Sequence, residues 1–274
     1  MPIVRVQGEK VNRNARDLVA GEEPMEIRLV AGGERATVAI TMRTPGNDFE
    51  LAAGFLHAEG IVKDREEIDL IRYCTEVDED QHYNVVNVEL RGSVLPALDR
   101  LERHFTVTSA CGVCGKAQLD AIELRGAPRL ASGTVVPVQT VTALPEVLRR
   151  NQDLFGATGG LHAAGLFDMQ GELVALREDV GRHNAMDKLL GWAFLERRPL
   201  DDQLVCVSGR ASFELLQKAV AARIPVFAAV SAPSSLAVDV ALRYGVTLIG
   251  FLRNGRFNVY AGAERITGLE ADPL

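Results

Sequence analysis

The sequence predicts an α/β fold, a layered mixed sheet with helices on both faces, with a smaller N-terminal β-rich part ahead of it. Two observations lead to this fold class. In the second half of the chain, short apolar runs alternate with segments of helical spacing, a pattern typical of partly parallel sheets. In the first half, segments that alternate apolar and polar residues lie on either side of glycines, as antiparallel strands do.

The first half of the chain contains the predicted β-rich part. The pair Gly32-Gly33 supplies a turn between two alternating segments. Asn47 followed by Glu50 predicts a capping box that begins a helix ending near Gly60. The strands predicted here are 26–30, 36–43, 82–91 and 104–108, and a further helix at 116–124 follows a pair of cysteines.

The second half carries the regular alternation. A connection at 126–137 leads to a helix at 144–155, and Gly159-Gly160 marks a break. The strands predicted after it are 161–167, 173–177, 204–207, 226–230, 247–252 and 257–260, and the helices are 183–196, 213–222 and 236–244. We therefore expect an N-terminal α+β region, residues 1–125, that ends in the cysteine loop and its helix. An α/β region, residues 126–274, would pack with it as one compact unit.

Composition excludes several classes of protein. The chain has 274 residues and a formal net charge of −7, whereas a general nucleic-acid binder needs a basic surface. No apolar run approaches the roughly 20 residues of a membrane helix, and the start lacks a secretory signal. Four cysteines are too few for a disulfide scaffold. We expect a cytoplasmic protein without a nucleic-acid or membrane partner, in which any anionic ligand is bound by a local cluster of basic residues.

The strongest chemical signal is the pair formed by Cys111 and Cys114. The thiolate, and not the thiol, attacks sulfur or binds a metal. Gly112 and Gly115 let the backbone fold around the two sulfur atoms, Lys116 adds a positive charge, and the following helix is expected to direct its positive end at them. These features indicate a reactive cysteine.

Three other interpretations of the cysteine pair remain open. Structural zinc, with His104 as a helper, normally requires four ligands, and the other two cysteines are single and distant. A thioredoxin-like oxidoreductase uses the same spacing, but several strands and a helix precede this motif. A zinc deaminase combines His-x-Glu with Pro-Cys-x-x-Cys, which His57 and Glu59 partly match. However, Ala110 replaces the proline, and His57 falls at the end of its predicted helix.

Segments of small, hydroxyl and basic residues occur where predicted strands run into helices or loops. Open α/β sheets bind ligands at such positions, and a helix N-terminus favours phosphate. Arginines recur in these segments, and a guanidinium binds phosphate bidentately. The segments are 159–162, 179–184, 208–212, 231–235 and 251–256. Together they predict an anion-binding rim for a phosphate-bearing ligand such as a nucleotide.

Five stretches resemble the formate dehydrogenase accessory sulfurtransferases, the FdhD family. One is Thr-Ser-Ala-Cys-Gly-Val-Cys-Gly-Lys at 108–116, and another is Ser-Gly-Arg at 208–210. The others are 159–164, 178–188 and 250–260. The match runs through nearly the whole chain from about Arg43, and this ordered set of motifs is far more specific than the cysteine pair alone.

The resemblance implies a sulfur carrier required for formate dehydrogenase activity. Such a carrier transfers persulfide sulfur from a cysteine desulfurase to the molybdenum cofactor, Mo-bis(molybdopterin guanine dinucleotide), before its insertion into the formate dehydrogenase catalytic subunit. The cofactor is cargo, and no permanently bound cofactor is expected. The implied fold is similar to that of cytidine deaminases, and the implied assembly is a homodimer. Two alternatives are kept: a cofactor-binding chaperone without sulfur chemistry, and a zinc-dependent deaminase-like hydrolase.

The resemblance also implies roles for individual residues. Cys111 and Cys114 are the expected catalytic residues of this sulfurtransferase, Cys111 as the acceptor of sulfane sulfur and Cys114 as a second thiol. No metal ligand is expected. His162 is a candidate for contact with a phosphate or the thiolate. The residues expected to bind the cofactor are Arg182, His183, Ser208, Arg210 and the stretch Phe251, Leu252, Arg253, Asn254, Gly255 and Arg256.

Overall fold

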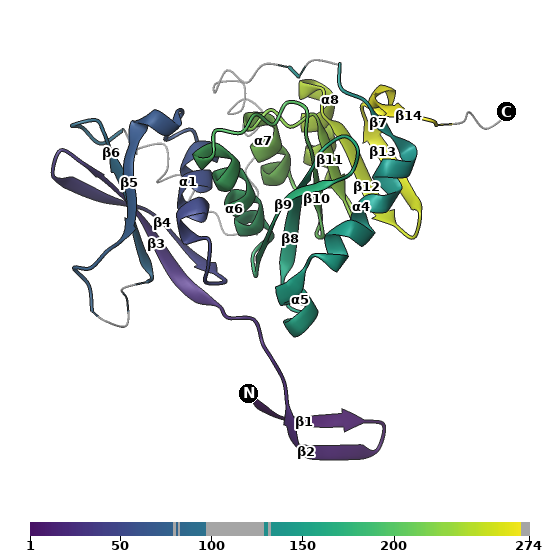
Figure 1. The fold of residues 1–274 in the computed structure, drawn as a ribbon, viewed down its shortest axis with the longest axis horizontal. Helices are drawn as coiled ribbons and strands as arrows, with labels where there is room; N and C mark the ends of the chain where they lie inside the picture. The colour runs from purple at the N-terminus through teal and green to yellow at the C-terminus, as the bar shows by residue number, and fades with distance from the viewer. Residues whose placement is uncertain (79–80, 82, 97–128, 131–132, 270–274) are drawn as a thin grey trace.

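The computed structural model describes residues 1–78, 81, 83–96, 129–130 and 133–269. A small sheet lies at one end of the body and a large sheet at the other, with helices between and around them (Figure 1). The predicted mixed α/β class is confirmed. The helices are α1 (Asp48–Ala58), α4 (Val138–Arg150), α5 (Asp153–Thr158), α6 (Arg182–Leu195), α7 (Phe213–Ala221) and α8 (Ser235–Tyr244), with the short 3-10 helices η1 (Arg65–Glu67) and η3 (Ala263–Arg265).

The large sheet has the strand order β13-β12-β11-β10-β8-β9. Its strands are β8 (His162–Phe167), β9 (Leu173–Asp179), β10 (Leu204–Val207), β11 (Val226–Ala229), β12 (Thr247–Arg253) and β13 (Arg256–Ala261). Strands β10, β11 and β12 are parallel, whereas β8 is antiparallel to both of its neighbours and β13 is antiparallel to β12. All six predicted strands are confirmed, with bounds that differ by one or two residues.

Helices cover both faces of this sheet, as predicted. The chain advances from β9 to β12 in one direction across the sheet, so the crossover helices α6, α7 and α8 come to lie on the same face. Their apolar side chains pack on alternate residues of the strands, such as Val205 and Phe227. Helix α4 covers the opposite face, where Leu144 and Leu148 pack with Cys206 and Ile249.

The small sheet has the strand order β4-β3-β6-β5. Its strands are β3 (Glu23–Ala31), β4 (Glu34–Arg43), β5 (Ile68–Tyr73) and β6 (Val85–Leu90). Gly32 and Gly33 turn the chain between β3 and β4, both with positive φ, as the sequence predicted. Helix α1 packs its buried residues on this sheet and its other side on α6, so it joins the two sheets. A two-residue parallel pair, β7 (Val136–Pro137) with β14 (Ile266–Thr267), lies beside the large sheet.

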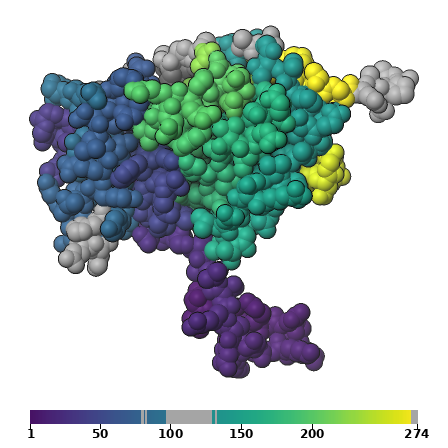
Figure 2. All heavy atoms as spheres, in the orientation of Figure 1, coloured from purple at the N-terminus to yellow at the C-terminus, as the bar shows by residue number. Residues whose placement is uncertain are grey.

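Two parts of the fold escaped the sequence analysis. Strands β1 (Pro2–Gln7) and β2 (Lys10–Arg16) form a hairpin that lies apart from the body (Figures 1 and 2). It buries only Ala15 among its residues, and its valines Val4, Val6 and Val11 are exposed, so no buried face gives its sequence a strand pattern. Strand β5 is an edge strand in which only Ile68 is fully buried, and its apolar residues do not alternate cleanly.

One predicted helix start was confirmed without its predicted cap, and another was wrong. Asn47 precedes α1, but its backbone is left-handed and its side chain makes no cap, so the predicted capping box is absent. Glu50 instead forms an ion pair with Arg177, with 2.5 Å between Oε2 and Nε. Helix α4 begins at Val138 and contains Pro145, whereas we expected a start at 144 because its first turns are rich in β-branched residues. It ends at Arg150, and α5 forms separately.

Several predictions lie outside the described residues. They are the strand at 104–108, the cysteine loop, the helix at 116–124 and the proposed boundary between residues 125 and 126. The division of the chain at that boundary therefore stays a prediction. In the described part, no helix is both long enough and apolar enough to cross a membrane.

Helices α1 and α6 touch through glycines. A Cβ atom on Gly54 would overlap the backbone carbonyl of Asp187, and one on Gly191 would overlap that of Glu50. These glycines let the two helix backbones approach more closely than any side chain would allow. The contact fixes α6, and with it the large sheet, against the small sheet.

We predict that Gly54→Ala and Gly191→Ala each destabilise the protein by about 3 kcal/mol or more, because the added methyl meets backbone that cannot move aside. Urea unfolding followed by circular dichroism measures this loss. Gly156→Ala is the matched control, since Gly156 is also helical but a Cβ there meets nothing within 4 Å. That variant should gain up to about 1 kcal/mol. A small loss at Gly54 and Gly191 would contradict the close approach.

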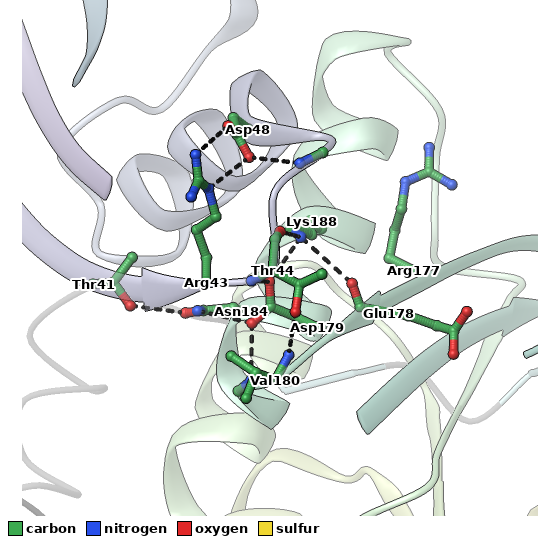
Figure 3. A network of polar contacts seen from close by, with 12 residues as sticks. Thr41, Arg43, Thr44, Asp48, Arg177, Glu178, Asp179, Val180, Asn184 and Lys188 are labelled. Carbon is green, nitrogen blue, oxygen red and sulfur yellow. Dashed lines mark hydrogen bonds and ion pairs between the residues drawn. The ribbon is translucent and has the colours of Figure 1, made fainter. Parts of the chain in front are cut away.

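A buried polar network holds the same region from within (Figure 3). The carboxylate of Asp179 is inaccessible to solvent, and Lys188 Nζ lies 2.7 Å from its Oδ2. The backbone N–H groups of Thr44 and Gly181 also donate to this carboxylate, at 3.1 and 2.8 Å, as does Asn184 Nδ2 at 3.1 Å. One side chain at the end of β9 thus binds the loop after β4 and two turns of α6.

The loop after β4 is fixed at several further atoms. Lys188 Nζ donates to the carbonyl of Thr44 at 2.8 Å, and Thr44 Oγ1 accepts from the backbone N–H of Val180 at 3.1 Å. Next to it, the buried guanidinium of Arg43 makes two bonds with Asp48, at 3.1 and 3.0 Å. The hydroxyl of Tyr73 donates to the same carboxylate, and burial followed by the Asp48 charge raises the pKa of Tyr73 to about 12. In this network the buried Arg43 therefore lies beside Asp48, and the buried Lys188 beside Asp179.

We predict that Asp179→Asn destabilises the protein by about 3–5 kcal/mol, because it leaves the buried Lys188 ammonium without its counter-charge. Adding Lys188→Met should recover part of this loss, since the uncompensated charge is then removed. Guanidinium chloride unfolding of the three proteins tests both statements. Arg150→Gln, which breaks the exposed pair with Glu146, is the control and should cost less than about 1 kcal/mol. Equal losses in Asp179→Asn and the control would refute the role of Asp179.

Candidate functional site

The predicted rim segments meet at one edge of the large sheet. Parallel strands β10, β11 and β12 end there, and β9 ends there too. Because β8 is antiparallel to β10, its first residue, His162, begins at the same edge. The loops that follow β10 and β11 run side by side, since Ser231 N donates to the Gly209 carbonyl and Ser234 N to that of Ala211. We call this edge the rim.

A basic cluster occupies one side of the rim. A Cβ on Gly209 would lie 3.3 Å from His162 Nδ1 and 3.7 Å from Arg182 Cδ, so all three residues adjoin. The pKa of His162 is lowered, first by burial and then by its neighbours Arg182, His183 and Arg210. The two arginine guanidinium groups supply positive charge to the cluster without His162. Such a cluster attracts anions.

Arg182 has a free donor in this cluster. Its Nε is buried and makes no hydrogen bond to any residue that the structure describes. Leaving a buried donor unpaired costs roughly 1–3 kcal/mol, and more for a charged group. Arg182 is the first residue of α6, where free backbone N–H groups and the helix dipole add positive potential. The site is therefore prepared for an acceptor that the described residues do not provide.

His183 lies beside a carboxylate that the sequence analysis missed. Its Nε2 is 3.2 Å from Ser212 Oγ and 3.3 Å from Glu214 Oε2. The hydrogen bond from His183 is the main reason that the pKa of Glu214 falls to about 2. Glu214 stands in the first turn of α7, where acidic residues are common, so nothing in the sequence set it apart.

A cavity of about 800 Å³ lies on the α4 side of the rim. It brings together five of the predicted site residues, which are His162, Ser208, Arg253, Asn254 and Gly255. Its size is within the range of small-ligand sites. The opposite wall comes from α4 and α5 and was not predicted. The residues of this wall with polar or aromatic side chains are Thr142, Glu146, Arg149, Gln152 and Phe155.

Two features of that wall suit a polar, planar ligand. The guanidinium of Arg149 lies 4.5 Å from the centre of the Phe155 ring. The side chain of Gln152 is almost fully buried, and its Nε2 makes no hydrogen bond within the described part of the chain. Arg149 and Phe155 offer flat surfaces, and Gln152 offers a donor. The sequence pattern did not predict these three residues as site residues. They lie on α4, on the short helix α5 and in the link between them, none of which has a distinctive motif.

The predicted stretch 251–256 comprises the end of β12, the turn at 254–255 and the first residue of β13. Phe251 and Asn254 both have positive φ, which is strained for residues other than glycine. The Phe251 backbone N–H donates to the Ser231 carbonyl, which fixes the turn at the rim. Leu252 points into the core with no exposed surface, so its side chain packs and does not line the cavity. Arg253 lines the cavity, and Arg256 is exposed outside the lining residues.

The predicted catalytic residues, Cys111 and Cys114, lie outside the described residues. The two described cysteines, Cys74 and Cys206, are both buried, and burial raises the pKa of the Cys206 thiol to about 12. A thiol with so high a pKa is a poor nucleophile at neutral pH. Within the described residues, then, no other cysteine competes for the predicted role.

The zinc-deaminase interpretation finds no support at its histidine. His57 lies in the last turn of α1, where its ring stacks on Phe194 with 4.5 Å between ring centres. Its Nδ1 is 3.2 Å from the Val62 carbonyl oxygen, and Glu59 Oε1 is 4.0 Å from Lys218 Nζ. These contacts hold both residues among the helices of the core. In the part of the chain that the structure describes, no group of histidine, cysteine and carboxylate side chains forms a metal site.

Comparison with known proteins agrees with these observations. The chain is 52% identical over 272 residues to the sulfur carrier protein FdhD of Streptomyces avermitilis, an alignment that covers 96% of this chain and 94% of that one. It is 50% identical over 260 residues to the protein of that name from Mycobacterium tuberculosis, with 92% of each chain covered.

A solved structure has the same fold. It is the crystal structure of a protein from Desulfotalea psychrophila that is assigned as a formate dehydrogenase accessory protein, with a TM-score of 0.75 and 26% sequence identity. The alignment covers 97% of this chain and 98% of that one. The sequence model of the FdhD/NarQ family matches residues 20–267, which include both sheets and the rim. This chain therefore belongs to the FdhD/NarQ family.

Proposed function

We propose that this protein is a sulfur carrier that serves the maturation of formate dehydrogenase. The observation that carries the proposal is its identity of about half to proteins named as sulfur carriers, along nearly the whole chain. The motif with Cys111 and Cys114 supplies the thiols that such a role requires. The rim supplies a separate place for an anionic cargo.

The proposed chemistry is a persulfide relay. The Cys111 thiolate attacks the outer sulfur of a persulfide on a cysteine desulfurase, so that an S–S bond forms on Cys111 and the desulfurase leaves as a thiolate. In the second step the Cys114 thiolate attacks Cys111 Sγ, so that the S–S bond to the outer sulfur breaks and a Cys111–Cys114 disulfide forms. The outer sulfur leaves as sulfide and passes to the molybdenum cofactor, which is the acceptor. A dithiol reductant then reduces the disulfide and regenerates both thiols. This cycle makes the protein a sulfurtransferase.

The rim is the proposed site for the cargo, Mo-bis(molybdopterin guanine dinucleotide). Its nucleotide parts carry phosphates, and the cluster of Arg182, His183 and Arg210 offers donors and positive charge to them. The cavity beside Ser208 and Arg253 is large enough for the remainder of a nucleotide. The Nε of Arg182, which no described residue pairs, supports an anionic ligand independently of any relative.

The remaining parts of the proposal rest on the family. We propose a cytoplasmic homodimer that exchanges partners, first the desulfurase and then the catalytic subunit of formate dehydrogenase. A layered sheet with helices on both faces agrees with a cytidine-deaminase-like arrangement, which we propose for the large sheet.

A second candidate function is a cofactor-binding chaperone without sulfur chemistry. The observation that favours it is the rim itself, because the described residues alone supply its charges, its cavity and its fixed turn. The two candidates differ in one point: whether Cys111 carries sulfur.

We predict that the wild-type protein gains the mass of one sulfur atom when it is incubated with cysteine, a cysteine desulfurase and pyridoxal phosphate, because Cys111 then carries a persulfide. Intact-protein mass spectrometry under non-reducing conditions measures the gain, and a reductant should remove it. Cys111→Ala should lose the gain completely. Cys114→Ala is the matched control, because it removes a thiol of the same loop and should retain it. No gain in any of the three proteins would favour the chaperone.

We predict that Arg182→Gln and Arg210→Gln each weaken the binding of guanosine diphosphate about tenfold to a hundredfold, since each removes a charge-assisted bond worth about 1.5–3 kcal/mol. Isothermal titration calorimetry at fixed salt gives the dissociation constants. Arg35→Gln is the control, because Arg35 is exposed in a surface pair with Glu76. Cys111→Ala should bind the nucleotide as the wild type does. Unchanged binding in both rim variants would place the nucleotide elsewhere.

A further inference from the structure

A second cavity lies at the opposite ends of the helices that begin at the rim. Helices α6 and α7 both start at the rim, and their carboxyl ends enclose a cavity of about 450 Å³ together with the segment that follows α1. We call it the helix-end pocket. Helix α6 has 14 residues, so the pocket is roughly 20 Å from the rim. A partner bound there leaves the rim open.

The pocket combines an apolar floor with a basic border. Leu190, Ala193 and Leu200 on its floor are buried, and Phe194 is partly buried. Five basic side chains line the pocket against three acidic ones, Asp64, Glu66 and Asp201, whereas the whole chain has a net charge of −7. The five are Lys63, Arg65, Arg197, Arg198 and Arg223. Positive charge is thus concentrated here in an acidic protein.

Two of these arginines occupy strained backbone positions. Arg197 and Arg223 follow the last residues of α6 and α7 with φ of 52° and 62°, the left-handed conformation that favours glycine. Three other helices end with a left-handed glycine, with φ of 71° to 73°: Gly60 two residues after α1, and Gly159 and Gly245 directly after α5 and α8. The two exceptions line the same pocket. A glycine at either position would relieve strain but remove the charge.

Compensation of the helix dipole does not account for the arginine after α7. A basic residue within the last turn already serves that purpose without strain. Helix α8 shows the arrangement, with Arg243 in its last turn and Gly245 after it. Helix α7 likewise has Lys218 in its last turn, whereas α6 has no basic residue in its last turn. The arginine at the strained position after α7 therefore has a use beyond the helix end.

Some basic side chains of the pocket have no acidic partner among the described residues. Arg197 pairs with Glu66 at 2.6 Å, and the guanidinium of Arg198 lies 5.2 Å from the Trp192 ring. The side chains of Lys63 and Arg223 make no ion pair or hydrogen bond with any residue that the structure describes. They are available to an acceptor outside the chain.

We infer that the helix-end pocket is a docking site for a segment of a partner protein that carries carboxylates next to an apolar side chain. The apolar side chain would pack on the apolar floor. The side chains of Lys63, Arg198 and Arg223 would donate hydrogen bonds to the carboxylates. A nucleic acid fits less well, because its closely spaced phosphates would meet Asp64, Glu66 and Asp201. The site is independent of the rim and of sulfur transfer.

Selection from a displayed library of random short peptides tests this inference. The full chain is the bait, and fluorescence anisotropy then gives the dissociation constant of the most enriched labelled peptide. We expect enriched peptides to combine aspartate or glutamate with leucine, isoleucine or an aromatic residue. The double variant Arg197→Gly and Arg223→Gly should bind at least tenfold more weakly than the wild type, while Arg35→Gln should bind equally. Enriched peptides without acidic residues, or equal binding by the double variant, would overturn the docking site.

The melting temperature separates docking from a structural role. Since glycine relieves the strained backbone, the double variant should melt at the same temperature as the wild type or a few degrees above it. A lower melting temperature together with lost binding would show that the arginines only serve the helix ends. Lys63→Gln with Arg198→Gln, which leaves both strained positions intact, must also weaken binding. A short oligonucleotide with the same net charge as the peptide serves as a competitor. If it displaces the peptide, and if its binding also requires the arginines, the partner is a nucleic acid and not a protein.

Discussion

The carboxylate of Asp179 is closed off from water, and four donors from three segments of the chain converge on it. A buried charge is tolerated only when its partners stay in place, because losing one of them leaves the cost of desolvation uncompensated. The bonds to Thr44, Gly181 and Lys188 therefore fix the loop after β4, the end of β9 and the first turns of α6 as one unit. The small sheet, the large sheet and the rim all depend on this constraint.

This constraint explains the dense motif at 178–188. Glu178 accepts from the backbone N–H groups of Leu154 and Phe155, which fixes the start of α5. Asn184 joins the network, and Lys188 neutralises Asp179. The residues between them, Arg182 and His183, are only partly buried and belong to the rim. In the sequence, the motif at 178–188 looks like a single binding segment. It combines residues that hold the fold together with two partly buried side chains, Arg182 and His183, whose positions those residues fix.

The sequence predicted the large sheet almost completely because its strands are apolar runs between clear helical segments. It predicted the small sheet where one face is buried, as in β3, or where both faces are, as in β6. It failed for the exposed β1–β2 hairpin and the edge strand β5, which have no continuous buried face to pattern their residues. Asn47 and Glu50 matched a local capping rule, but Arg177, 127 residues away in the chain, takes the Glu50 carboxylate.

The candidate site was predictable to the same degree. Residues at strand ends could be placed together because parallel strands bring their carboxyl ends to one edge. That argument located His162, Arg182, Ser208, Arg210 and Arg253 near one another. It could not locate Glu214, Arg149 or Gln152. Glu214 and Arg149 lie on helices and Gln152 lies between two helices, and the direction in which these side chains point depends on how the helices pack. Nor could it separate Leu252, whose side chain belongs to the core, from its neighbours in the same stretch.

The two ends of α6 and α7 present positive charge for different physical reasons. At the rim the helix amino ends, Arg182 and Arg210 act together, so the field there attracts a compact, highly charged group such as phosphate. At the helix-end pocket the carboxyl ends of α6 and α7 carry partial negative charge, which lowers the positive potential of the basic border. The remaining field is weaker, and an apolar contact has to supply the rest of the binding energy. A phosphate-bearing cargo at one end and an acidic, partly apolar protein segment at the other are the ligands that these opposite helix polarities favour.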